Sequence, residues 1–207
     1  MRNSILFALA LALSPLAGTA QGNLLIDVGQ ISLLPNQAGQ KVNVFVYSDV
    51  PDSTQGIGFN VQLGDGGPAL GGVDITPSIT SVDAVGSGTL FEFFHNPPNI
   101  ENLPPSFANV GFTVGGGPGF VSIPVGPSLL GVVTFDTTGF GPGYSTTLKL
   151  GDTLNGETFL ASTIGLMTIN DGSITIVPEP GGFALAGLSL LGMISLAYRR
   201  RKRALAH

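Results

Sequence analysis

The chain lacks cysteine altogether and holds only two histidines among its 207 residues. Without cysteine there are no disulfides, thiolate metal sites or thiol nucleophiles, so a folded domain must be stabilised by its core. A Ser-His-Asp triad would have to use His95, because His207 is the last residue of the chain. His95 lies beside Asn96-Pro97-Pro98 with no recognisable nucleophile elbow. We therefore expect no enzyme activity.

Positive charge is nearly absent between the two ends of the chain. Six of the eight cations are Arg2 and a cluster near the C-terminus, which leaves only Lys41 and Lys149. Thirteen acidic residues accompany these two lysines up to Pro180, so the segment from residue 21 carries 2 − 13 = −11. Nucleic acid and anionic lipid require basic surfaces, so this acidity argues against both as partners. The acidic residues lie mostly in turns, and no two are marked as a pair for glycoside hydrolysis.

The N-terminal residues have the pattern of a secretory signal. Arg2 supplies the positive end, residues 5–13 form an apolar stretch, and small residues follow at Gly18 and Ala20. The apolar stretch is too short to cross a hydrocarbon core of about 30 Å, and Ser14-Pro15 interrupts the helix after it. We expect a signal helix over residues 1–20, engagement by the secretion machinery, and cleavage by signal peptidase after Ala20.

The C-terminal end contains a second hydrophobic segment. Pro178, Glu179 and Pro180 precede two glycines, an uncharged run over residues 183–198, and a basic cluster. The cluster consists of Arg199, Arg200, Arg201, Lys202 and Arg203. Sixteen helical residues span roughly 24 Å, and snorkelling arginines can cover the shortfall of a transmembrane helix. The cations should stay in the cytoplasm, so the preceding domain should lie outside it.

This tail over residues 177–203 resembles the PEP-CTERM sorting tail of Gram-negative bacteria, which is also catalogued as an ice-binding-protein C-terminal motif. The resemblance rests on Pro178-Glu179-Pro180, a short hydrophobic helix and a terminal basic cluster in that order. It implies transient anchoring in the inner membrane, recognition by exosortase, and passage to the cell surface or extracellular matrix. The alternative is an ordinary single-pass anchor. The threonines form isolated pairs rather than a ladder, so we do not predict ice binding.

The segment between the two signals, residues 21–176, is long enough for one domain with a proper core. Short apolar and β-branched runs are separated by Gly, Pro, Asn and Asp clusters, and no window has helical periodicity, which predicts an all-β fold. The expected strands are residues 24–27, 30–34, 42–47, 57–63, 80–85, 89–94, 107–114, 129–136, 146–150, 158–160 and 172–176.

Two of these strands alternate clearly between apolar and polar residues. Residues 42–47 and 57–63 each read as strands with one face in a core and one in solvent. The spacing favours a two-sheet β-sandwich closed as a jelly roll or Greek key. Residues 56–63, 130–136 and 171–176 resemble the strands of cohesin and related carbohydrate-binding-module sandwiches. That resemblance implies the fold, and no residue motif extends it to a dockerin partner.

A calcium site is the candidate that the acidic turns suggest. Asp152, Asn155 and Glu157 bring oxygen ligands together in a glycine-containing turn, and Asn170-Asp171-Gly172 follows later. Neither segment has EF-hand spacing. The competing interpretation is an Asn-Gly hairpin turn with solvated acids and no cofactor.

Exposed aromatic side chains would favour carbohydrate binding, but tryptophan is absent. We expect Phe91 and Phe93 to pack in the core. Three functions are then open: a structural or adhesive component of the cell surface, a carbohydrate-binding module for extracellular polysaccharide, and, least favoured, a hydrolase.

Overall fold

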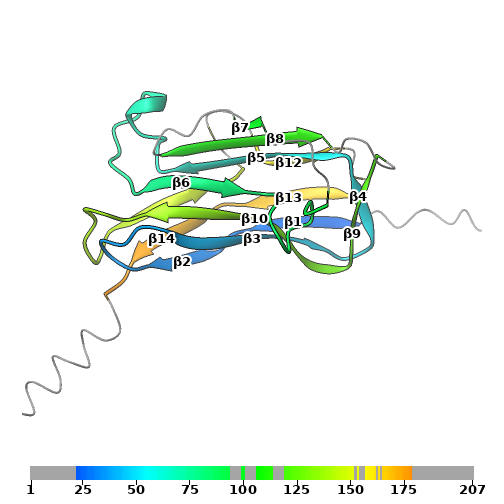
Figure 1. The fold of residues 1–207 in the computed structure, drawn as a ribbon, viewed down its shortest axis with the longest axis horizontal. Coiled ribbons are helices and arrows are strands. Elements are labelled where there is room, and N and C mark those ends of the chain that lie inside the picture. The colour runs from blue at the N-terminus through cyan, green and yellow to red at the C-terminus, as the bar shows by residue number, and fades with distance from the viewer. Residues whose placement is uncertain are drawn as a thin grey trace, which may run out of the picture.

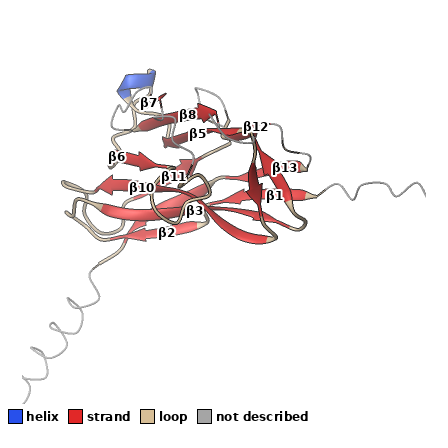
Figure 2. Cartoon of the chain, turned by 45° about the vertical axis from the view of Figure 1, so that its right-hand side comes forward, coloured by secondary structure: helices blue, strands red, loops and turns tan. Residues whose placement is uncertain are grey.

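The computed structural model of the chain describes residues 22–93, 99–100, 106–113, 119–151, 153, 157–161, 163 and 165–178. These residues form β-strands and one turn of 3-10 helix, η1 (Pro68–Leu70), which confirms the all-β prediction. Most strands follow the long axis of the molecule (Figure 1), and loops and turns join them (Figure 2). Within the described ranges no helix is both long and apolar enough to span a membrane. The expected helices over residues 1–20 and 183–198 lie outside those ranges.

The described strands form two main sheets that face each other across the core. The first has five strands in the order β13 (Leu166–Asn170), β1 (Asn23–Asp27), β3 (Gln40–Ser48), β10 (Gly126–Asp136) and β6 (Ser78–Asp83). The second has the order β2 (Gln30–Leu33), β14 (Gly172–Ile176), β11 (Ser145–Lys149), β5 (Gly56–Leu63), β8 (Phe107–Thr113) and β7 (Asn99–Ile100), with β12 (Phe159–Ala161) also paired to β5. A separate ribbon pairs β4 (Asp52–Thr54) with β9 (Val121–Ile123).

Two segments of the chain pass from one sheet to the other, side by side. β1 continues into β2, and β13 continues into β14; β1 pairs with β13 and β2 with β14, both in parallel. The two crossings touch at Gly29 and Gly172, where the Ser173 amide donates to the Gly29 carbonyl oxygen at 3.1 Å. Consequently the described chain enters at one end of the long axis and leaves at the other (Figure 1).

The core lies between the sheets and is built from alternating side chains. On β3, Val42, Val44 and Val46 are buried while Asn43 and Tyr47 are exposed, as the alternation predicted. Facing them across the core are apolar residues of β5, β8, β11 and β14. No ionised side chain lies among these buried residues. The sandwich is therefore held by apolar packing, as the lack of cysteine requires.

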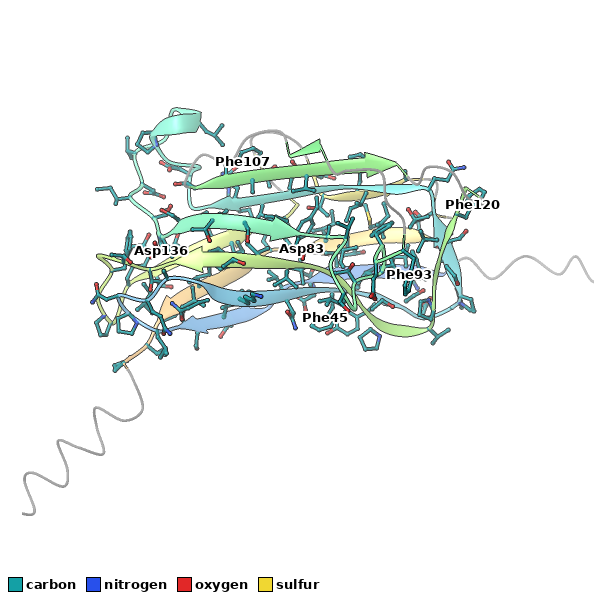
Figure 3. The ribbon with its side chains drawn as sticks, viewed as in Figure 1. Phe45, Asp83, Phe93, Phe107, Phe120 and Asp136 are labelled. Atoms are coloured by element: carbon teal, nitrogen blue, oxygen red, sulfur yellow. The ribbon has the colours of Figure 1, made fainter. Side chains whose placement is uncertain are left out.

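The prediction for β5 was wrong in one respect, because all eight of its residues are buried. The ring of Phe159, paired in register with Gly58, occupies the space where a Gly58 side chain would project. The Asn60 Nδ2 donates to the Glu157 carbonyl oxygen at 2.9 Å. Phe107, in register with Gln62 at the start of β8 (Figure 3), is also fully buried. The face expected to meet solvent is thus covered.

The expected strand over residues 89–94 is also wrong. Residues 84–93 form bends and turns, because backbone amides there donate hydrogen bonds to nearby carboxylates and do not continue the preceding strand. Asp83 Oδ1 accepts from the Gly86 amide at 2.7 Å, and Glu92 Oε2 accepts from the Gly88 amide at 2.8 Å. The Leu90 amide donates to the Leu129 carbonyl oxygen at 2.7 Å, which holds this turn against β10. Conversely, β4, β7, β9 and β13 were not predicted.

Candidate functional site

The junction between the sandwich and the tail is the first candidate site. The last strand, β14, ends at Ile176, and the Val177 amide still donates to the Leu33 carbonyl oxygen at 2.9 Å. Pro178 follows directly and is exposed. Of the predicted sorting residues, Glu179, Pro180 and the cluster of Arg199, Arg200, Arg201, Lys202 and Arg203 lie outside the described residues.

A polar network around the buried Thr137 side chain stabilises the end of the sandwich from which the tail leaves. The Thr137 hydroxyl donates to the Leu34 carbonyl oxygen at 2.7 Å and accepts from the Gln37 amide at 3.0 Å. The Gln40 side chain donates to the same hydroxyl at 3.0 Å. Thr137 is fully buried, so these bonds join the turn before β3 to the turn after β10 in a fixed arrangement.

The candidate calcium loop connects β11 to β12. Asp152 and Asn155 lie outside the described residues, and Glu157 is exposed. The base of the loop is closed by the Thr158 amide, which donates to the Leu150 carbonyl oxygen at 2.8 Å. The Thr158 hydroxyl binds both backbone groups of Asn60, as a paired strand would. It accepts from the Asn60 amide at 3.0 Å and donates to the Asn60 carbonyl oxygen at 2.9 Å.

A hollow of about 580 Å³ lies beside this loop. Asp27, Glu157 and Asp171 line it together with Asn170 and the apolar side chains of β13. Asp171 Oδ1 accepts from the amides of Leu150 and Gly151 at 2.8 and 2.9 Å, and so anchors the loop. Among the described residues, no three His, Asp or Glu side chains are close enough to hold a metal. The calcium site stays a prediction.

Several carboxylates act as acceptors for nearby loop amides and hydroxyls. The Asn23 amide lowers the pKa of Asp49, and the Val73 amide lowers the pKa of Asp65. The Thr138 hydroxyl lowers the pKa of Asp136. Each shift favours the ionised form, whereas a general acid needs its pKa raised. His95, the single histidine that we weighed for catalysis, lies outside the described residues.

Aromatic residues divide between the core and the surface. Phe91 is fully buried, as predicted, but Phe93 is 80 % exposed, so its assignment to the core was wrong. Figure 3 shows Phe45 and Phe93 on the same half of the molecule. Phe45 and Tyr47 project from the outer face of the five-stranded sheet, with ring centroids 6.3 Å apart. Sequence alternation along β3 could have identified this outward pair.

Comparisons with known proteins give one match to the tail and several to the sandwich. A family model described as the PEP-CTERM protein-sorting motif matches residues 177–202, which confirms the tail resemblance. No curated protein matches the chain.

Solved structures to which the chain is similar include cohesin domains, the fold that the second resemblance named. The third ScaC cohesin of Acetivibrio cellulolyticus, solved with the ScaB dockerin, is 17 % identical over 74 % of this chain and 99 % of its own, with a TM-score of 0.49. CaCohA2 of Clostridium acetobutylicum is 13 % identical over 75 % of this chain and 91 % of its own, with a TM-score of 0.48. The Coh-OlpC–Doc435 complex of Clostridium thermocellum gives 13 % identity over 77 % and 95 %, with a TM-score of 0.48.

Proposed function

We propose that this protein is exported, held in the inner membrane by its tail, and transferred by exosortase to the cell surface or extracellular matrix, where it is a structural or adhesive component. In this proposal residues 1–20 are the signal peptide, residues 21–176 the mature domain and residues 177–203 the sorting tail. The observation that supports it is the sorting-motif match over residues 177–202, directly after the last strand.

The tail residues have separate roles in this proposal. Pro178, Glu179 and Pro180 form the segment that exosortase recognises. Residues 183–198 cross the membrane, and the basic cluster Arg199, Arg200, Arg201, Lys202 and Arg203 stops transfer on the cytoplasmic side.

A binding or structural role is favoured over an enzymatic one. The lowered pKa values of Asp49, Asp65 and Asp136 favour ionised carboxylates that accept hydrogen bonds from neighbouring groups. The core is apolar, and the buried Thr137 hydroxyl joins two turns through its hydrogen bonds. These features suit a stable module that displays a surface.

Processing is tested by intact mass of the protein purified from envelopes of a host with and without exosortase. We expect loss of the residues through Ala20 in both hosts, and loss of the tail near Pro180 only where exosortase is present. The variant Glu179→Ala should keep the tail in both, while the control Glu157→Ala should be processed normally. Retention of the basic cluster in the exosortase host would contradict the proposal.

We infer carbohydrate binding as the second candidate function, supported by the outer face of the five-stranded sheet. Tyr47 is 40 % exposed beside Phe45, and two aromatic rings at this spacing offer sugars an apolar surface. Exposed Asn43 and Lys41 follow on the same face of β3 and can donate hydrogen bonds to hydroxyl groups.

Affinity electrophoresis in the polysaccharide of the native host tests this second function. The wild-type protein should be retarded, and Tyr47→Ala should migrate as it does in a gel without polysaccharide. Phe93→Ala, which removes an exposed ring outside this pair, serves as the matched control and should remain retarded. Equal mobility of all three proteins with and without polysaccharide would exclude glycan binding by Phe45 and Tyr47.

A further inference from the structure

We propose that the end of the sandwich from which the tail leaves is a membrane-contacting surface, formed by Val73, Ile75, Phe140 and Tyr144. While the tail is inserted, these side chains lie in the headgroup layer of the bilayer that holds it. The inference rests on the proposed anchoring by the tail, and adds to it a defined orientation of the domain on the membrane.

The first argument is distance, because β14 ends only a few residues before the predicted membrane segment. The Ile176 amide donates to the Tyr144 carbonyl oxygen at 2.8 Å, and the Val177 amide is bound to Leu33. From Val177 to the first residue of the apolar run, Phe183, is six residues, which reach at most about 20 Å when fully extended. The end of the sandwich must therefore stay close to the membrane surface.

The second argument is that apolar side chains gather at this end. Val73 and Ile75 are 83 % and 79 % exposed, among the most exposed large apolar residues of the described chain. The Tyr144 hydroxyl donates to the Ile75 carbonyl oxygen at 2.9 Å, which connects them to the point where β14 ends. Phe140 packs edge-on against Tyr144, with ring centroids 4.9 Å apart. Tyrosine is a residue that favours the membrane interface.

The third argument is charge. Residues 34–39 and 137–144, the turns at this end, contain no ionisable side chain other than Tyr144, although the whole segment from residue 21 to Pro180 carries −11. The flanking carboxylates of Asp65 and Asp136 accept hydrogen bonds from Val73 and Thr138. Asp74, the third, accepts from the Asp65 amide at 3.1 Å.

Lipid is the occupant that these observations favour. None of the four side chains is a cation that would attract an acidic partner, and the surface lies at the end of the sandwich from which the predicted membrane segment follows. A contact of this kind depends on apolar insertion, not on electrostatic attraction, so it should form on zwitterionic lipid. The network around Thr137 holds the adjoining turns in place, so that contact requires no refolding.

The absence of tryptophan makes a direct test possible. The chain would be exported by a host without exosortase, purified with its tail, and reconstituted into phosphatidylcholine vesicles. Ile75→Trp places the single indole on the proposed surface, and Val73→Trp serves as a second variant there. Val125→Trp is the matched control, since Val125 is 59 % exposed beside Gly126, which pairs with Ser48 at the opposite end. Emission wavelength, quenching by brominated lipid and quenching by aqueous acrylamide would be measured.

We expect a blue shift and quenching by brominated lipid for Ile75→Trp and Val73→Trp, with acrylamide quenching only for Val125→Trp. If the vesicles carry the protein in flotation but both surface indoles stay open to acrylamide, the membrane-contacting surface is wrong and the anchoring stands. Protection of the surface indoles from acrylamide that requires added exosortase would assign the surface to exosortase. Protection that appears in detergent with rising protein concentration would assign it to a second copy. Either result would overturn the proposal. A wild-type chain that does not float would overturn both.

Discussion

Phe91 and Phe93 are only two residues apart, yet the first is fully buried and the second is 80 % exposed. In an extended strand both would point to one face, and the sequence was interpreted in that way. The turn in which the Gly88 amide donates to the Glu92 side chain interrupts the extended backbone. The Phe91 and Phe93 rings therefore point in different directions, one into the core and one into solvent. The position of each ring depends on hydrogen bonds that end a strand.

This difference predicts unequal effects of the same substitution. Phe91→Ala should lower the free energy of unfolding by about 3–5 kcal/mol, because it leaves a cavity in the core. Phe93→Ala should change it by no more than about 0.5 kcal/mol, as expected for an exposed side chain. Urea unfolding followed by circular dichroism measures both. Similar midpoints for the two variants would contradict the burial of Phe91.

At the scale of elements, the two sheet crossings depend on close backbone contact. A side chain at Gly172 would overlap the Gly29 carbonyl oxygen, which belongs to the neighbouring crossing and cannot rotate away. Because the contact is with backbone, relief requires the parallel strands to move apart. Glycine is therefore required at this position for packing, not for a left-handed backbone.

Gly172→Ala should accordingly destabilise the fold by roughly 1–3 kcal/mol, the usual cost of overpacking. The matched control is Gly141→Ala, where an added Cβ meets nothing within 4 Å, and stability should change by less than about 0.5 kcal/mol. Denaturant midpoints at unchanged m-value report the difference. Equal midpoints for the two variants would show that the crossings are looser than described.

The β11–β12 loop is the element that tests the calcium prediction. If Asp152, Asn155 and Glu157 bind calcium, a concentration about a hundred times the dissociation constant stabilises the native state by roughly 2.7 kcal/mol. The melting temperature should then rise by several degrees and fall again on chelation. Asp152→Ala should abolish the shift, and Asp49→Ala should keep it. An unchanged melting temperature would identify the loop as a solvated turn.

For the whole molecule, the continuous segments β1–β2 and β13–β14 couple the two sheets. Each segment contributes a strand to both sheets, so neither sheet can separate without breaking the pairs of the other. The same arrangement places the first and last described residues at opposite ends of the long axis (Figure 1). A tail that leaves from one end then orients the whole domain.

This coupling predicts unfolding in a single transition. Tyr47 lies in the five-stranded sheet, Tyr144 immediately precedes β11 of the other sheet, and Tyr198 is the third tyrosine, in the tail. With Tyr198→Phe present in both, Tyr144→Phe and Tyr47→Phe each leave one reporter in a different sheet. Without tryptophan, their fluorescence is directly visible. The two variants should unfold at one midpoint, matching circular dichroism. Separate midpoints would mean that the sheets unfold independently.

The local sequence by itself determined most strands and the sorting tail. Three features each extend over only a few residues: the alternation along β3, the Gly, Pro, Asn and Asp clusters between strands, and the order of the tail features. They can therefore be recognised without knowledge of distant contacts. Short strands such as β4 and β9 lack enough residues to show a period.

Only the tertiary structure decided what covers each face. β5 is buried on both faces because Phe159 and Glu157, far away in sequence (97 residues for the Asn60–Glu157 pair), lie over Gly58 and Asn60. In the same way, Ile75 lies beside the tail junction because Tyr144 binds its carbonyl oxygen. A side chain's own sequence neighbours set the direction in which it points, but burial depends on which distant segment the fold brings against it.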